Sequence, residues 1–144
     1  MADAKTLRAL HVVARALKRA GREPGRAGDD LTTQQAEALL TLLERGVIST
    51  SSFAELLGID PSTASRNVSG LQRAGLVTRR RATMDGRQTD LGLTPRGKRT
   101  AEALAAERRA AYSALLDRVP RGDRERIDHA LAILAQALGD DRRG

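Results

Sequence analysis

Two short helical segments that meet at Gly58-Ile59-Asp60 constrain this chain more than any other feature. In the first, residues 49–58, Ser52 and Glu55 have the spacing of a capping box, and a glycine ends the segment. The second covers residues 60–75 and also ends at a glycine. Two capped helices this close together predict a helix-turn-helix, in which the second is the recognition helix.

The second segment has one apolar side and one polar side. It begins with Asp60 as the N-cap and Pro61 at the first helical position, a strong start signal. At about 100° per residue, Ala64, Val68 and Leu71 lie on one side. The polar residues that we expect to contact DNA are short hydroxyl side chains and arginines: Ser62, Thr63, Ser65, Arg66, Ser69 and Arg73. A helix that needed only solubility would more often carry Glu and Lys there.

A basic β-hairpin is expected directly after this helix. Residues 76–80 are typical of a strand, residues 88–93 of its return, and Asp85-Gly86 between them is a turn signal. A hairpin in this position is a wing. Arg79, Arg80 and Arg81 alternate in direction along a strand, so they cannot all face DNA.

Helices are expected on both sides of this lobe. The first spans about residues 3–20, and another begins after Thr32, which forms a capping box with Gln35. The region 95–138 is helical with a break at 119–122. Its last helix carries an apolar stripe with heptad-like spacing, which we expect to pack against another apolar surface. The stripe consists of Ile127, Leu131, Leu134 and Leu138. The alternative is a monomer in which these helices pack only on their own lobe.

The positive charge is concentrated in one stretch of the chain. The net charge is +7, and residues 61–100 hold nine basic and two acidic side chains, which accounts for all of it. A merely solvated surface would spread the excess. This concentration is typical of a protein that binds a polyanion such as DNA.

Several classes of protein are disfavoured by what the sequence lacks. With one Phe, one Tyr and no Trp, it does not suit a nucleic-acid module built on aromatic stacking. The absence of cysteine excludes disulfides and thiol redox sensing, and two histidines are too few for a metal site. We find no signal peptide, no membrane span and no catalytic motif. We therefore expect a cytoplasmic protein that is not an enzyme and carries no cofactor.

The motifs in this order resemble the MarR family of bacterial transcription regulators. The resemblance rests on DPSTASRNVSGLQRAGLVTRR (60–80), on FAELLGI (53–59) and on the wing MDGRQTDLGLTPRGKR (84–99), with Asp85-Gly86-Arg87 at its tip and a Leu-Thr-x-x-Gly after its second strand. It covers residues 31–99 strongly and the flanking helices by pattern only.

The resemblance implies a mainly α fold with a small β-hairpin wing, a winged helix-turn-helix at residues 31–99. Helices at 3–20 and 95–138 would form a homodimer within a single domain of residues 1–144. The dimer would bind a pseudo-palindromic operator in double-stranded DNA. Arg87 would enter the minor groove and Asp85 would orient it, although Asp85 is also an ordinary turn residue.

The resemblance also implies a repressor that a small aromatic or phenolic effector releases. Candidates to line such a pocket are polar residues on largely apolar helices: His11, Arg15 and Tyr112. A constitutive or architectural DNA-binding protein without an effector is the alternative. A winged helix that has lost DNA and binds protein is disfavoured, because it would have no reason to keep a basic wing.

Overall fold

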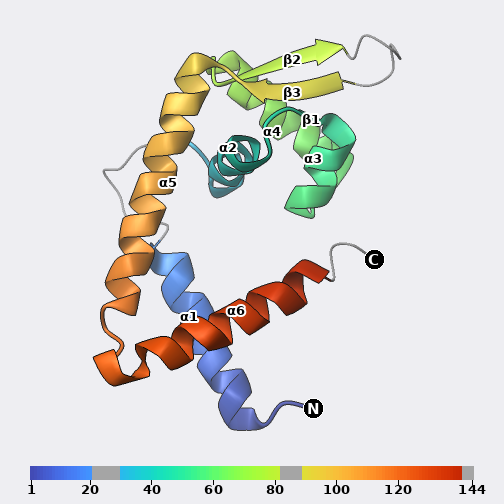
Figure 1. Ribbon diagram of the computed structural model, residues 1–144. Helices are drawn as coiled ribbons and strands as arrows, with labels where there is room; N and C mark the ends of the chain where they lie inside the picture. The colour runs from blue at the N-terminus through green and yellow to red at the C-terminus, as the bar shows by residue number, and fades with distance from the viewer. Residues whose placement is uncertain (21–29, 82–88, 141–144) are drawn as a thin grey trace. The chain divides into compact units, whose positions relative to one another are not determined.

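The computed structural model describes residues 1–20, 30–81 and 89–140, which fall into two compact units, Met1–Ala110 and Ala111–Gly144. Helices dominate, and a small sheet lies in the first unit (Figure 1). The elements follow in the order α1 (Ala4–Ala20), α2 (Thr33–Arg45), β1 (Ile48–Ser49), α3 (Thr50–Leu57), α4 (Pro61–Arg73), β2 (Val77–Arg81), β3 (Thr89–Leu93), α5 (Pro95–Leu116), the 3-10 helix η1 (Arg121–Asp123) and α6 (Arg124–Asp140). The expected class, mainly helical with a β wing, is confirmed.

The core lies where helices α2, α3 and α4 pack on one another and against the sheet (Figure 1). Among the described residues, every buried apolar side chain lies between Ala38 and Ala101. The largest that are fully buried are Phe53, Leu39, Leu71, Leu91 and Val68. The apolar stripe predicted for the second helix of the helix-turn-helix is correct, since Ala64, Val68 and Leu71 are all buried.

The wing is part of a three-stranded antiparallel sheet in the order β1-β3-β2. The two strands of the hairpin match the predicted ones to within one residue at each end. The sequence did not predict β1, which pairs Ile48 with Leu91 and Ser49 with Asp90. A strand of two residues is too short to show an alternating apolar-polar pattern in the sequence. It can be recognised only from its pairing with a distant strand. The Thr50 hydroxyl donates to the Thr89 carbonyl at 3.0 Å and strengthens this connection.

Most of the predicted helix caps are present. Thr32 and Gln35 form the expected capping box, and Asp60 accepts from the Thr63 amide. The expected cap of α3 was wrong: Ser49, not Ser52, is the N-cap, and its hydroxyl accepts from the Ser52 amide at 3.2 Å. The helix begins three residues earlier because β1 ends at Ser49 and leaves that residue in an extended conformation.

The start of α5 is fitted closely to the end of the recognition helix. Thr94 is its cap: the Thr94 hydroxyl accepts from the Gly97 amide and donates to the Gly75 carbonyl at 2.7 Å. A Cβ on Gly97 would lie 1.8 Å from the carbonyl oxygen of Leu76. Only glycine fits there, because the helix backbone touches the chain that leads into β2.

The terminal helices, each considered alone, carry exposed apolar side chains. No residue of α1 is buried, and in α6 none is buried from Arg124 to Gly139. Leu10 and Val13 of α1 are about half exposed, and so are Leu131 and Ile133 of α6. In the ranges that the structure describes, no helix is long and apolar enough to cross a lipid bilayer.

Candidate nucleic-acid interface

The first turn of α4 is organised around Asp60. One carboxylate oxygen accepts from the Thr63 amide at 3.0 Å and from the Ser62 hydroxyl, and the other accepts from the Thr63 hydroxyl at 2.6 Å. These bonds, that of the Ser62 hydroxyl first, hold the pKa of the Asp60 carboxyl well below its usual range. Ser62 and Thr63 were predicted to contact DNA. Since both hydroxyls donate to Asp60, only their lone pairs remain for a partner in this arrangement.

The outward side of α4 carries the other predicted contacts. Ser65, Arg66 and Arg73 are exposed, whereas Ser69 is half-buried. All four lie on a helix whose opposite side is held by the core, so the side chains are presented on a rigid support. Such a surface can place arginines against base edges or phosphates.

The first turn of α2 is docked against the middle of α4, which the sequence did not predict. The Asn67 amide donates to Gln34 Oε1 at 3.1 Å. Gln35 accepts from the Thr32 amide at 3.0 Å through its Oε1 atom, and its Nε2 atom lies 2.8 Å from the place where a Cβ on Gly70 would be. Gly70 therefore makes room for the Gln35 amide, which explains a glycine in the interior of this helix.

The register of the sheet separates the three wing arginines. Arg79 lies opposite Leu91 and shares a face with the buried Val77, and Arg81 follows on that face. On this face Val77 and Leu91 are buried in the same core cluster as Val68 and Leu71 of α4. Arg80 lies opposite Asp90 and projects from the other face. The predicted wing-tip residues Asp85 and Arg87 lie outside the described residues.

The exposed basic side chains of this surface have no acidic partners among the residues that the structure describes. Within residues 30–81 and 89–140, none of the following forms an ion pair: Arg66, Arg73, Arg79, Arg80, Arg81 and Lys98. Their charge is thus available to an external anion. Arg96 has a local role instead, since its Nη1 atom donates to the Ala74 carbonyl at the end of α4 at 3.3 Å.

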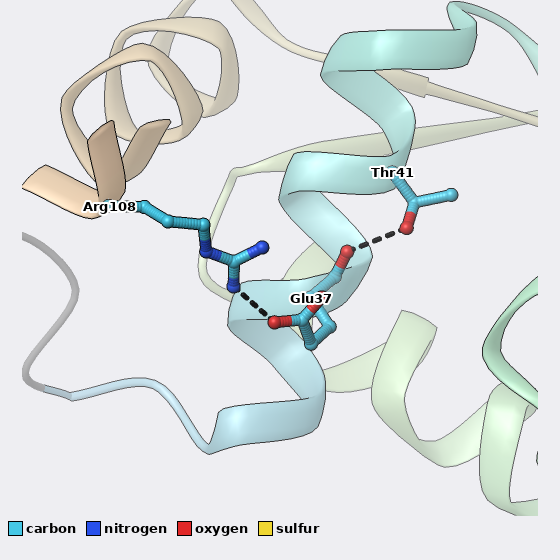
Figure 2. A network of polar contacts seen from close by, with 3 residues as sticks. All are labelled: Glu37, Thr41 and Arg108. Atoms are coloured by element: carbon cyan, nitrogen blue, oxygen red, sulfur yellow. Dashed lines mark hydrogen bonds and ion pairs between the residues drawn. The ribbon is translucent and has the colours of Figure 1, made fainter. Parts of the chain in front are cut away.

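An ion pair joins the lobe to α5. Arg108 of α5 donates to the carboxylate of Glu37 on α2, and one turn further along α2 the Thr41 hydroxyl donates to the Glu37 carbonyl at 2.8 Å (Figure 2). The Arg108 and Glu37 side chains are 34% and 45% exposed, so solvent weakens the attraction. The pair links α5 to α2, which carries the residues docked against α4.

The residues predicted to line an effector pocket are on two elements. His11 and Arg15 lie on α1 and are exposed, and Tyr112 lies on α5 and is half-buried. Nothing in the described structure tests their role. Over the same residues, no cluster of three or more His, Cys, Asp or Glu side chains could hold a metal ion.

Comparison with known proteins gives consistent results. A family model described as MarR family matches residues 29–88. The HTH-type transcriptional repressor MdtR of Bacillus subtilis is 29% identical over 113 residues, which are 78% of this chain and 73% of that protein.

Two solved structures extend the likeness over nearly the whole chain. A MarR family protein from Bacillus stearothermophilus superposes with a TM-score of 0.80 at 24% identity and covers 94% of each chain. FabT of Streptococcus pneumoniae, solved in complex with DNA, gives a TM-score of 0.70 at 18% identity and covers 94% of this chain and 92% of its own. At these identities, the two structures establish the shared fold.

Proposed function

Because this chain is a member of the MarR family, we propose that it is a sequence-specific DNA-binding transcription repressor that acts as a homodimer. The observation that carries the proposal is the surface of exposed arginines on α4 and β2, which form no ion pair with any described residue and are supported by a well-packed core. The repressor MdtR and the DNA-bound FabT support it.

The recognition helix would enter the major groove. Arg66 and Ser65, which are exposed in the first half of α4, are the candidates for base edges, and Arg73 near its end is a candidate for phosphate. Ser62, Thr63 and Ser69 would make secondary contacts, because the first two hydroxyls are bonded to Asp60 and Ser69 is half-buried.

The wing would add contacts with the DNA backbone and with the minor groove beside the recognition helix. Arg79 and Arg81 share the sheet face whose Val77 is buried in the core with residues of α4, which makes them better candidates for phosphate than Arg80. The family pattern places Arg87 in the minor groove, with Asp85 bracing it. Replacing Arg87 by Ala should then weaken binding while the far-ultraviolet circular dichroism spectrum stays unchanged.

The terminal helices would form the dimer interface. The exposed apolar side chains of α1 and α6 supply the surface that a second copy would bury. A two-fold dimer would present two recognition helices to half-sites about 34 Å apart, one turn of DNA.

Release by a small effector is the regulatory half of the proposal. His11, Arg15 and Tyr112 remain the candidates for an effector pocket, because each is a polar group on a helix with many apolar neighbours. If DNA binding responds to no small molecule, the constitutive or architectural alternative replaces this half and leaves the DNA-binding half intact.

A gel-shift titration against the DNA upstream of the protein's own gene tests the proposal. Random competitor DNA and a salt series separate specific binding from the electrostatic contribution. We expect a dimeric shift that survives competitor, and about a tenfold loss of affinity for Arg66→Ala. Arg118→Ala, an exposed arginine outside the basic stretch, is the matched control. Equal loss in both variants, or a shift that random DNA removes completely, would leave only non-specific binding.

A further inference from the structure

Helix α5 begins at a joint with the end of the recognition helix, made by Thr94 and Arg96. The Thr94 hydroxyl donates to the Gly75 carbonyl at 2.7 Å, and the Thr94 amide donates to the Leu76 carbonyl at 3.1 Å. Arg96 donates to the Ala74 carbonyl, where α4 ends. This joint fixes one point of α5 against α4. It does not by itself fix the direction in which the rest of a 22-residue helix runs.

Apolar packing holds α5 on the lobe over the first half of the helix. Ala101 is fully buried, and Leu104 is partly buried and packs against the core cluster. Among the described residues of α5, none after Leu104 belongs to that cluster. Arg108 comes one turn later and lies on the same side of the helix as Leu104. At this position a polar contact takes over where the apolar packing ends.

The polar contact is the ion pair of Arg108 with Glu37 on α2 (Figure 2). At about 1.5 Å per residue, Arg108 is about 18 Å along the helix from Arg96. A rotation of about 10° at the joint would therefore displace Arg108 by about 3 Å, enough to break the pair. Helix α2 is itself docked on the middle of α4, where Asn67 donates to Gln34. The pair thus connects α5 to the recognition helix at a second point.

We propose that Arg108 and Glu37 are positioning residues that fix the angle between α5 and the recognition helix. Glu37 is negatively charged, which does not suit a phosphate contact, so its role in DNA binding would be indirect. Both side chains are partly exposed, and such pairs contribute little to stability. The pair would therefore determine the direction of α5 more than the stability of the lobe.

The angle matters for DNA because α5 would lead from each lobe to the dimer interface. In a two-fold dimer it would set the separation of the two recognition helices, and with it the half-site spacing that the protein accepts. This consequence rests on the proposed function, whereas the angle itself is a property of one chain.

Distances between two spin labels test the angle without DNA. The chain has no cysteine, so Glu55→Cys on α3 and Ala110→Cys on α5, both at exposed positions, give two unique labelling sites. Labelled chains are mixed with an excess of unlabelled ones, so that only distances within one chain are measured. We expect a narrow distance distribution that becomes about twice as broad in Glu37→Gln and in Arg108→Gln. The charge swap, Glu37→Arg with Arg108→Glu, should narrow it again.

A gel-shift titration then separates position from charge. Arg108→Gln removes a positive charge and Glu37→Gln a negative one, so a purely electrostatic effect would change DNA affinity in opposite directions. The measured quantity is the ratio of the affinity for a palindromic operator, selected by the wild-type chain from random DNA, to that for one half-site. We expect this ratio to fall about threefold to tenfold in both variants and to recover in the charge swap. Arg109→Gln, at the neighbouring exposed position, is the control and should leave the ratio unchanged.

The two readouts distinguish the possible failures. Unchanged distance distributions in both variants, or a charge swap that restores nothing, would show that the pair does not fix the angle. A large loss of stability in urea would make the pair a structural contact instead. Broader distributions with an unchanged affinity ratio would refute its role in DNA recognition. A chain in which the pair controls the distances but which binds no DNA specifically would refute the proposed function and leave the positioning of α5 standing.

Discussion

The winged lobe and the terminal helices use the same apolar side chains in opposite ways. In the lobe, Leu39, Phe53 and Leu91 are fully buried, and polar caps close the ends of its helices. In α1 and α6, leucines and valines at similar helical spacing are exposed. Apart from Val47, all the exposed large apolar side chains of the described residues lie in residues 1–17 and 131–138.

This difference shows which part of the molecule is complete within one chain. A lobe that closes its own core gains stability from burial without a partner. An amphipathic helix with an exposed apolar side gains that stability only when another surface covers it. This difference supports the proposal that the lobe is the rigid surface for DNA and that a second copy of the chain covers the terminal helices.

Breaking the lobe from inside should have the largest effect. Gly97→Ala places a Cβ against the Leu76 carbonyl, so the start of α5 must move away from β2. We expect the free energy of unfolding in urea to fall by about 3 kcal/mol. Gly122→Ala, where a Cβ would meet nothing within 4 Å, is the control. A similar small change in both variants would mean that the close fit at Gly97 contributes little.

Breaking the terminal helices should leave the lobe folded and separate the subunits. Leu131→Asp combined with Leu134→Asp places two charges on the apolar seam of α6, and we expect the dimer dissociation constant to rise at least about a hundredfold. Sedimentation velocity measures it, and DNA affinity should fall with it. Gln136→Asp, on the opposite side of α6, is the control. A dimer unchanged by the double substitution would place the interface elsewhere.

The two faces of the wing should differ by a smaller factor. Arg79→Ala should weaken DNA binding about tenfold and reduce the slope of log affinity against log salt by about 1, as expected for a lost phosphate contact. Arg80→Ala removes the same charge from the opposite face and should lower affinity about twofold. Equal losses in a gel-shift salt series would show that the sheet face does not select the contact.

The smallest effect is expected where α2 docks on α4. Gly70→Ala improves helix propensity by about 1 kcal/mol, yet its Cβ displaces the Gln35 amide. We expect unchanged stability in urea and a threefold to tenfold loss of DNA affinity, about 1 kcal/mol. Gln35→Ala with Gly70→Ala should bind no more weakly than Gln35→Ala alone. Full affinity in Gly70→Ala would show that this docking does not position the recognition helix.

Much of the lobe could be predicted from local sequence. The N-cap at Asp60, the proline after it and the apolar positions of α4 are decided by residues within one or two helical turns. The same holds for the Thr32 capping box and for the Thr94 cap. These features depend on groups close together in the chain, so the sequence alone determined them.

The rest depends on contacts between distant residues. Strand β1 exists only because β3 pairs with it, and the start of α3 follows from that pairing. Position 70 needs a glycine because the side chain of Gln35, 35 positions earlier, lies against it. Position 97 needs a glycine because the carbonyl of Leu76 lies against it. The pairing register of β2 with β3 decides from which face of the sheet each arginine projects. Composition and spacing predicted a basic surface for DNA, but only packing determined how its side chains are oriented, because direction is set by the neighbours against which each element closes.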